Sequence, residues 1–140
     1  MKPIFVIDTN NVVIFRKKAT KKAAQLNRLL KLMRKIKQIG DVLPVASAEL
    51  KYRIDDVQTL KSYISQGIII ESPPYMDNDE YMLEIAQQFS AYIVSNDHFR
   101  PYQKDYQTAI KRRLSFMFVK DDQGEFIPIL PWIRQIGVVS

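Results

Sequence analysis

The chain has no cysteine, and only four of its 140 residues are glycine. The absence of cysteine excludes disulfides and thiolate metal sites, which fits a reducing compartment. Neither GxxxxGKS/T nor GxGxxG occurs, so a phosphate-binding loop of either kind is excluded. The single histidine, His98, excludes a mechanism in which two imidazoles of one chain act as acid and base. Carboxylates remain as the candidate catalytic groups.

Long apolar runs are also missing. No run approaches the roughly 18 residues of a transmembrane helix, and no signal-peptide pattern opens the sequence. We therefore expect a soluble, cytoplasmic protein with no membrane partner. With 140 residues and 46% hydrophobic composition, the chain suits a single domain over residues 1–140.

Acidic residues are absent from one long interval, between Asp8 and Asp41. This interval carries much of the positive charge of a chain whose net charge is +6, through Arg16, Lys17, Lys18, Lys21, Lys22, Arg28, Lys31, Arg34, Lys35 and Lys37. Such a basic segment attracts polyanions, and nucleic acid is the commonest candidate. The alternative is a solvated helix face that only aids solubility.

Short apolar segments alternate with amphipathic ones along the chain. Strands are expected at 3–7, 41–47, 68–70, 91–95 and 115–119, and helices at 20–39, 55–67, 77–89 and 102–113. Pro44, within the second strand, must occupy a position that needs no ladder donor. A turn at 121–124 leads into a last strand at 125–129. The order predicts an α/β domain with a mostly parallel central sheet of about five strands, helices on both faces and a C-terminal hairpin.

Two of the expected strands end in acidic and amide residues. The first runs into Asp8-Thr9-Asn10-Asn11, and the fourth runs into Ser95-Asn96-Asp97. In open α/β sheets, ligands bind at the carboxyl ends of the strands. The helix before the fourth strand should begin at that same edge, with Asp79 in its first turn. We therefore expect Asp8, Asp79 and Asp97 to converge.

Converging carboxylates repel one another unless a cation lies among them. A few carboxylates, with waters in the other positions, typically hold Mg²⁺ on a phosphate substrate, so Mg²⁺ or Mn²⁺ is the expected cofactor. Asn11 and Asn96 could support the ligands or contact phosphate, and Ser95 or Thr9 could orient a carboxylate. The alternative for each acid taken alone is a helix N-cap. A response-regulator receiver fits less well, because it needs an acidic pair where Asp8 stands alone.

Three segments resemble the PIN-like NYN ribonucleases of the Regnase type, the nuclease domain of CCCH zinc-finger mRNA-decay endonucleases, and their stand-alone prokaryotic relatives. Val6-Ile7-Asp8-Thr9-Asn10-Asn11-Val12 is similar to the family's hydrophobic-Asp-Gly-Ser-Asn-Val pattern. Ile93-Val94-Ser95-Asn96-Asp97-His98-Phe99-Arg100 is similar to its Val-Ser-Asn-Asp-x-Tyr-Arg-Asp pattern, and Arg113-Leu114 precedes Phe116-x-Phe118-Val119. The resemblance runs from about Ile4 to Phe126.

The resemblance implies a three-layer α/β/α PIN-like, Rossmann-like fold. It also implies that Asp8, Asp79 and Asp97 are the catalytic acids and the Mg²⁺ ligands, and that Arg100 contacts RNA. Two departures are Asn78, where the family often has a further acid, and Pro101, where it has Asp. Asn78 therefore joins Asn11, Ser95 and Asn96 among the supporting residues. The further acids Asp77, Asp105 and Glu49 are additional candidates, and the zinc finger of the animal members is absent.

The basic segment gains a more definite role from this reading. Lys17, Lys18, Lys21 and Lys22 follow soon after Asp8, where they could hold the RNA backbone through salt-dependent phosphate contacts. Three aromatic residues could stack on unpaired bases or pack against the domain, namely Phe15, Phe99 and Tyr102.

We therefore expect a Mg²⁺- or Mn²⁺-dependent endoribonuclease that hydrolyses single-stranded or loop RNA. Two alternatives stay open. One is an RNA-binding PIN-like module with weak or lost catalysis, and the other is a toxin-like nuclease controlled by a partner. The sequence also leaves open whether a homodimer is needed to complete the cleft.

Overall fold

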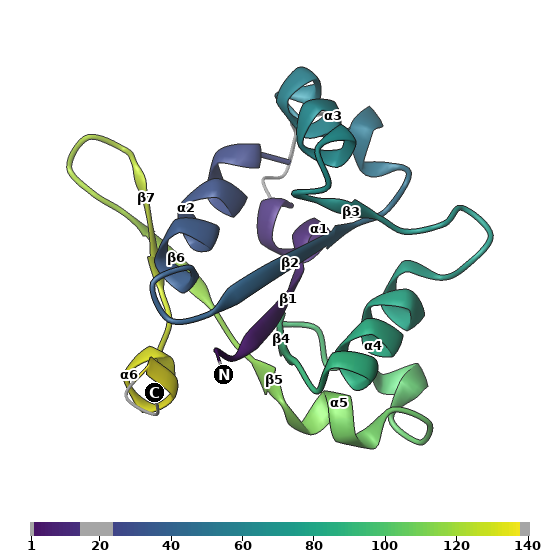
Figure 1. The fold of residues 1–140 in the computed structure, drawn as a ribbon. Coiled ribbons are helices and arrows are strands. Elements are labelled where there is room, and N and C mark those ends of the chain that lie inside the picture. Colours follow the sequence, from purple (N-terminus) through teal and green to yellow (C-terminus); the bar gives the residue numbers. More distant parts are fainter. Residues whose placement is uncertain (1, 15–23, 138–140) are drawn as a thin grey trace.

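The computed structural model describes residues 2–14 and 24–137. Five parallel strands form the central sheet in the order β3-β2-β1-β4-β5 (Figure 1), with β1 at Ile4–Asp8, β2 at Asp41–Ala46, β3 at Ile70–Glu71, β4 at Tyr92–Val94 and β5 at Arg113–Leu114. The chain moves outward from β1 through β2 to β3, and β4 then pairs with the other side of β1. The carboxyl ends of β1 and β4 therefore lie side by side where the strand order reverses, which is where open α/β sheets bind ligands.

Helices cover both faces of this sheet, as the sequence predicts. They are α1 (Thr9–Val13), α2 (Leu26–Ile36), α3 (Val57–Ser65), α4 (Asn78–Phe89), α5 (Gln107–Lys111) and α6 (Ile133–Gly137), with short 3₁₀ turns η1 (Leu50–Tyr52) and η2 (Arg100–Tyr102). Phe5 and Ile7 of β1 pack with α1, α2 and α3 on one face, whereas Val6 packs with α4 and α5 on the other. This alternation follows from the two-residue period of a strand. None of the described helices is long and apolar enough to cross a bilayer.

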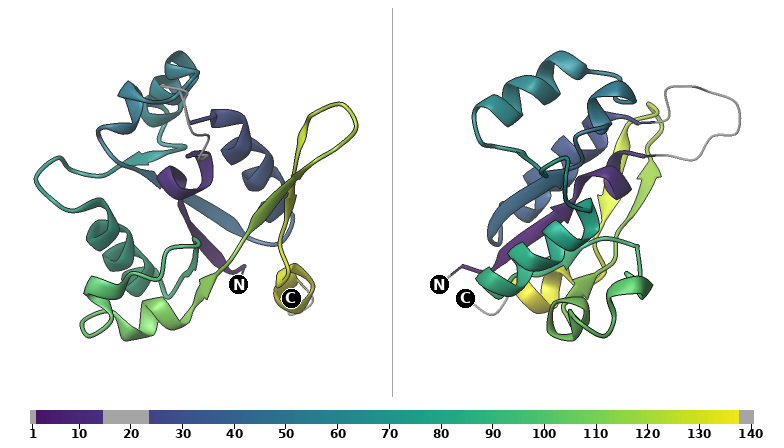
Figure 2. Two further views of the ribbon diagram at one scale, coloured as in Figure 1. Left: turned by 180° about the vertical axis from the view of Figure 1, so that it is seen from behind. Right: turned by 90° about the vertical axis from the view of Figure 1, so that its right-hand side faces the viewer.

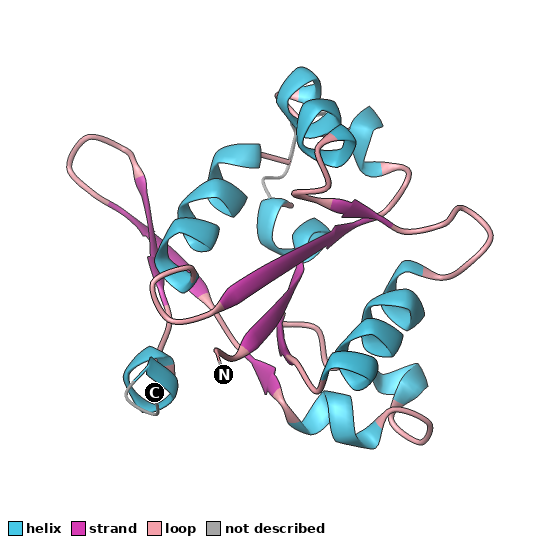
Figure 3. Cartoon of the chain, viewed as in Figure 1, coloured by secondary structure: helices cyan, strands magenta, loops and turns pink. Residues whose placement is uncertain are grey.

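The C-terminal hairpin forms as expected, and the segment before it differs from the prediction. β6 (Met117–Lys120) pairs antiparallel with β7 (Phe126–Ile129), apart from the central sheet (Figures 2 and 3). The predicted strand at 115–119 is therefore the first arm of the hairpin, and the two-residue β5 completes the central sheet. The predicted helix over 102–113 is wrong in its bounds, because only Gln107–Lys111 is α-helical. Of the residues expected to begin this helix, Tyr102 ends the 3₁₀ turn Arg100–Tyr102, which contains Pro101, and residues 103–106 are not helical.

Pro44 and Gly40 each restrict the backbone in or next to the second strand. Among the described residues, β3 pairs with β2 only at Val45 and Ala46, so Pro44 precedes that ladder, as its missing N–H requires. Gly40 lies just before β2, where a Cβ atom would be 2.4 Å from the backbone oxygen of Pro3 and 2.7 Å from the ring of Phe5. Glycine is required there by close approach.

Part of the basic segment holds the hairpin against α2. Arg28 is buried, its Nε donates to the backbone oxygen of Val12 at 2.7 Å, and its guanidinium lies 4.2 Å from the ring centre of Phe118. Further along α2, Lys31 pairs with Glu125 at 2.6 Å, and Lys35 Nζ donates to the backbone oxygen of Pro128 at 2.9 Å. These three cations of the basic segment therefore contact other parts of the fold, mainly the hairpin.

Candidate functional site

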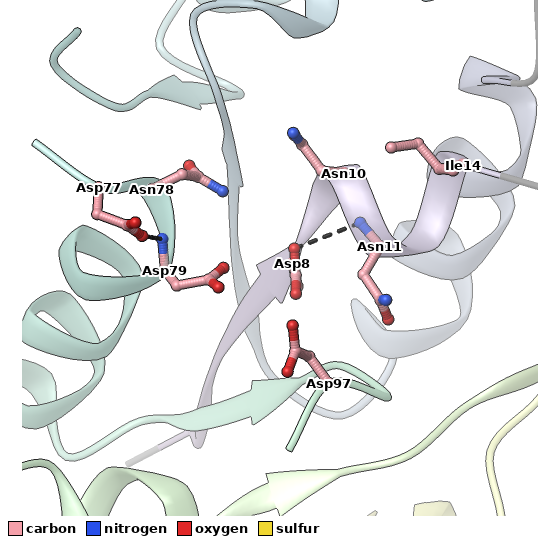
Figure 4. A pocket seen from close by; sticks show the side chains of 8 residues that line it. All are labelled: Asp8, Asn10, Asn11, Ile14, Asp77, Asn78, Asp79 and Asp97. Carbon is pink, nitrogen blue, oxygen red and sulfur yellow. Dashed lines mark hydrogen bonds between the residues drawn. The ribbon is translucent and has the colours of Figure 1, made fainter. Parts of the chain in front are cut away.

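A cleft of about 440 Å³ opens at the carboxyl ends of β1 and β4. The end of β1 and the start of α1 form one wall, and the N-terminus of α4 forms the other (Figure 4). The carboxylates of Asp79 and Asp97 point toward Asp8 across this space. The lining residues are Asp8, Asn10, Asn11, Ile14, Asp77, Asn78, Asp79 and Asp97. The structure thus brings the three predicted acids to one cleft.

Asp8 is the buried acid of the cleft, with 3% of its surface exposed. Its Oδ2 accepts a hydrogen bond from Ser95 Oγ at 2.7 Å, and its Oδ1 accepts one from the backbone N–H of Asn11 at 3.3 Å. Burial raises the pKa of Asp8 to about 7, the bond from Ser95 opposes this rise, and the charges of Asp79 and Asp97 add to it. Asp8 is both the N-cap of α1 and a carboxylate that strongly resists ionisation in this environment.

The N-terminus of α4 supplies the opposite wall. Asp77 caps the helix, because its side chain accepts the backbone N–H of Asp79 at 2.8 Å. Asp79 is half-buried, and its pKa is raised to about 6 by burial, with further contributions from the charges of Asp97 and Asp77. Asn78 also lines the cleft, and its Oδ1 is buried without a hydrogen-bond partner in the part of the chain that the structure describes. The acid Asp77, which sequence reasoning left undecided, thus belongs to the cleft.

Ser95, Asn11 and Asp97 form one hydrogen-bonded unit. Besides binding Asp8, Ser95 Oγ accepts the backbone N–H of Asp97 at 3.0 Å, so one hydroxyl links both acids. Asn11 Oδ1 accepts the backbone N–H of Asn96 at 2.9 Å, which ties the end of β1 to the segment after β4. The carboxylate of Asp97 accepts the backbone N–H of Phe99 at 2.8 Å. Ser95 is therefore positioned to orient Asp8, and Asn11 to hold the two strand ends together.

The Asn96 side chain faces a different partner. Its amide nitrogen donates to the backbone oxygen of Phe116 at 2.9 Å, and its amide oxygen accepts the N–H of Phe116 at 3.0 Å. Asn96 is not among the residues that line the cleft. Its observed contacts therefore secure the chain before the hairpin, and they leave the proposed phosphate contact without structural support.

Other candidate residues lie outside the cleft lining. Arg100, Glu49 and Asp105 are exposed, whereas Phe99 is only 1% exposed and packs in the core, so it cannot stack on a base as it stands. Thr9 is buried, and its hydroxyl has no hydrogen-bond partner among the described residues, so of these two hydroxyls only that of Ser95 contacts Asp8 there. The predicted phosphate-binding Lys17, Lys18, Lys21 and Lys22, together with Phe15, lie outside the described residues.

Asn10 is a lining residue that sequence reasoning did not select. Its amide nitrogen donates to Ser47 Oγ at 2.7 Å, and its amide oxygen accepts the N–H of Ser47 at 3.1 Å. These bonds fix the start of α1 to the end of β2. Asn10 could have been found by the same pattern that indicated Asn11, namely an amide residue that follows an acid at the end of a strand.

The carboxylate oxygens that line the cleft are the ligand type that a hard cation prefers, although these carboxylates are not arranged around a single point. Three carboxylates face the same space, and no Lys, Arg or His of residues 2–14 and 24–137 is among the lining residues. Within residues 2–14 and 24–137, no three Asp, Glu, His or Cys side chains are close enough to hold one ion together. Burial is the main reason that the pKa values of Asp8 and Asp79 are raised, and the charges of the neighbouring carboxylates raise them further.

Comparison with known proteins identifies the family. Two solved structures of the nuclear protein-only RNase P 2 (PRORP2) of Arabidopsis thaliana resemble the chain, with TM-scores of 0.67 and 0.66 and sequence identities of 18% and 19%. Both matches cover 91% of this chain, which spans 29% of the PRORP2 chain, and they confirm the predicted fold. No curated protein matches the sequence significantly. The Zc3h12a-like ribonuclease NYN domain matches residues 1–127, and the chain therefore belongs to this family of ribonuclease domains.

Proposed function

We propose that the chain is a Mg²⁺- or Mn²⁺-dependent endoribonuclease that cleaves single-stranded or loop RNA. The observation that carries the proposal is the convergence of Asp8, Asp79 and Asp97 on one cleft, whose described lining residues include no cationic side chain. Membership of a ribonuclease domain family supports RNA as the substrate. The position of the cleft, at the reversal of strand order, supports it as the binding site.

In this proposal, Asp8, Asp79 and Asp97 would hold the ion. Bound Mg²⁺ or Mn²⁺ would lower the pKa of a coordinated water and stabilise the charge that develops on the phosphodiester. Ser95 keeps Asp8 oriented toward the cleft, and Asp77 keeps Asp79 at the first turn of α4. Because Asp8 and Asp79 have raised pKa values, protons compete with the ion, and metal affinity should rise between pH 5 and pH 8.

Basic side chains would hold the phosphates of the RNA substrate. We propose that Lys17, Lys18, Lys21, Lys22 and Arg100 bind phosphates on either side of the scissile linkage. Of these, Arg100 is exposed and follows the segment that contains Asp97. Replacing all four lysines by Gln should weaken RNA binding and reduce its dependence on salt concentration, since each phosphate contact contributes to the slope.

The test is cleavage of a labelled single-stranded RNA by the purified chain. Cleavage should require Mg²⁺ or Mn²⁺, stop in excess EDTA, and fall at least a hundredfold in Asp97→Asn, which removes one charge without changing size. Asp41→Asn is the matched control, because Asp41 is an exposed aspartate at the amino end of β2, at the opposite edge of the sheet. Full activity of Asp97→Asn, or activity in EDTA, contradicts the proposal.

A second candidate function is RNA binding with little or no catalysis. Two observations favour it: the acids are not close enough to hold one ion as they stand, and Asn78 occupies a lining position where an acid would add charge. It predicts salt-dependent RNA binding, unchanged in Asp97→Asn, with no metal-dependent cleavage. Isothermal titration with Mg²⁺ separates the two candidates, because only the first requires Asp8-dependent metal binding.

A further inference from the structure

The most exposed large hydrophobic side chain in the described part of the chain is Tyr75, at 88%. It lies in the loop between β3 and α4, which projects from the molecule (Figure 3). Within the described residues, no hydrogen bond or ring contact involves its side chain. Packing of the fold therefore does not account for an aromatic ring at this position.

The backbone around Tyr75 is fixed at several points. The N–H of Met76 donates to the backbone oxygen of Pro73 at 3.2 Å, which closes a four-residue turn with Pro74 in its second position and Tyr75 in its third. Before the turn, the N–H of Ser72 bonds the backbone oxygen of Ala46 at 2.8 Å. After the turn, Asp77 caps α4. These hydrogen bonds fix the backbone on both sides of Tyr75. A ligand that binds to the ring would therefore need to order little more than the Tyr75 side chain.

The turn adjoins the acidic cleft. Asp77 and Asn78 line the cleft, and Tyr75 precedes Asp77 by two residues, so their Cα atoms are at most about 7 Å apart. Tyr52 is the other strongly exposed tyrosine, at 79%. It is a weaker candidate, because Lys51 Nζ lies 5.5 Å from the centre of its ring and no residue of η1 lines the cleft.

We propose that Tyr75 is a stacking platform for one unpaired RNA base, next to the nucleotide whose phosphate lies in the cleft. This inference rests on the proposed ribonuclease function and adds a requirement for unpaired nucleotides on the α4 side. Every base has a π-face, so stacking on a tyrosine tolerates any sequence, whereas a base inside a duplex has both faces covered. Tyr75 would therefore select single-stranded over paired RNA without reading sequence.

The experiment measures binding of the intact chain to a single-stranded oligoribonucleotide containing 2-aminopurine, in EDTA so that no cleavage occurs. Tyr75→Ala should weaken binding about tenfold and remove the quenching of 2-aminopurine, since stacking on an aromatic ring accounts for roughly that factor. Tyr75→Phe keeps the ring and should keep both signals. Phe89→Ala is the matched control, because Phe89 is an exposed aromatic at the far end of α4.

The same oligonucleotide annealed to its complement should bind equally to wild type and Tyr75→Ala. In cleavage assays with metal, Tyr75→Ala should raise KM about tenfold and leave kcat within about twofold. Binding and quenching by Tyr75→Ala equal to wild type overturn the inference, as does a wild-type chain that binds no single-stranded RNA. Normal stacking signals in a chain that never cleaves RNA would instead refute the proposed catalysis and leave the platform standing.

Discussion

Replacing Asp8 by Asn should make the metal-free protein more stable at pH 8 than the wild type, while it removes cleavage. Asp8 is 3% exposed, and burial raises its pKa from 3.8 to about 7. Between these values the folded chain keeps a proton that the unfolded chain releases. The contribution of Asp8 to stability therefore falls as pH rises through this window and reaches its lowest level above pH 7.

The size of the effect follows from the width of the window. Each pH unit well between the two pKa values changes the free energy of unfolding by about 1.4 kcal/mol, and this change becomes smaller near the upper pKa. The wild type should therefore lose about 2 kcal/mol from this group between pH 5 and pH 7. Asn at position 8 cannot ionise, and its amide oxygen can still accept a hydrogen bond from Ser95. The advantage of Asp8→Asn over the wild type should therefore be smallest at pH 5 and largest at pH 8.

Urea unfolding in EDTA at pH 5, 6, 7 and 8 measures this difference, with Asp41→Asn as the control for loss of an exposed charge. Adding Mg²⁺ at pH 8 should stabilise the wild type and leave Asp8→Asn unchanged, because only a state that binds the ion gains from it. Parallel pH profiles for wild type and Asp8→Asn would refute the assignment of Asp8 as a buried, destabilising charge.

Three further substitutions test parts of the fold that position the cleft. Ser95→Ala removes the hydroxyl that bonds Asp8 and should cost about 1–3 kcal/mol in urea unfolding, raise the pKa of Asp8 and weaken Mg²⁺ binding in titration calorimetry. Gly40→Ala places a Cβ atom 2.4 Å from the backbone oxygen of Pro3 and should destabilise the chain by about 1–3 kcal/mol, detected as a lower thermal midpoint. Arg28→Ala removes a buried cation that contacts the hairpin and should cost about 2 kcal/mol or more; hydrogen exchange should then increase in β6 and β7.

The acids of the cleft could be predicted because local patterns determine where strands and helices begin and end. Asp8 and Asp97 follow apolar runs that form parallel strands, and parallel strands present their carboxyl ends at one edge. Asp79 follows an N-cap residue, Asp77, that marks the start of α4 from sequence alone. Three local signals therefore sufficed to place three distant acids together.

Contacts made by distant partners could not be predicted in this way. The role of Arg28 depends on a hairpin that returns to α2 from the other end of the chain, and a charge pattern gives no sign of this. The end of the helix expected at 102–113 depends on β5, whose two residues carry no recognisable strand pattern. From the sequence, Phe99 could either stack on a base or pack against the domain, and only the tertiary structure shows that it lies in the core. In each case tertiary packing overrides the local preference.

The paired hydrogen bonds between Asn96 and the backbone of Phe116 set a limit on how this cleft can be transplanted. A designer who grafts the Ser95-Asn96-Asp97 segment onto another parallel sheet transfers an amide whose donor and acceptor both need backbone partners from a later part of the chain. Without an equivalent of Phe116, that amide loses two partners next to the acid it helps to hold. The smallest set of segments that could be grafted therefore includes the chain around Phe116, which leads into the hairpin, although no residue of the hairpin lines the cleft.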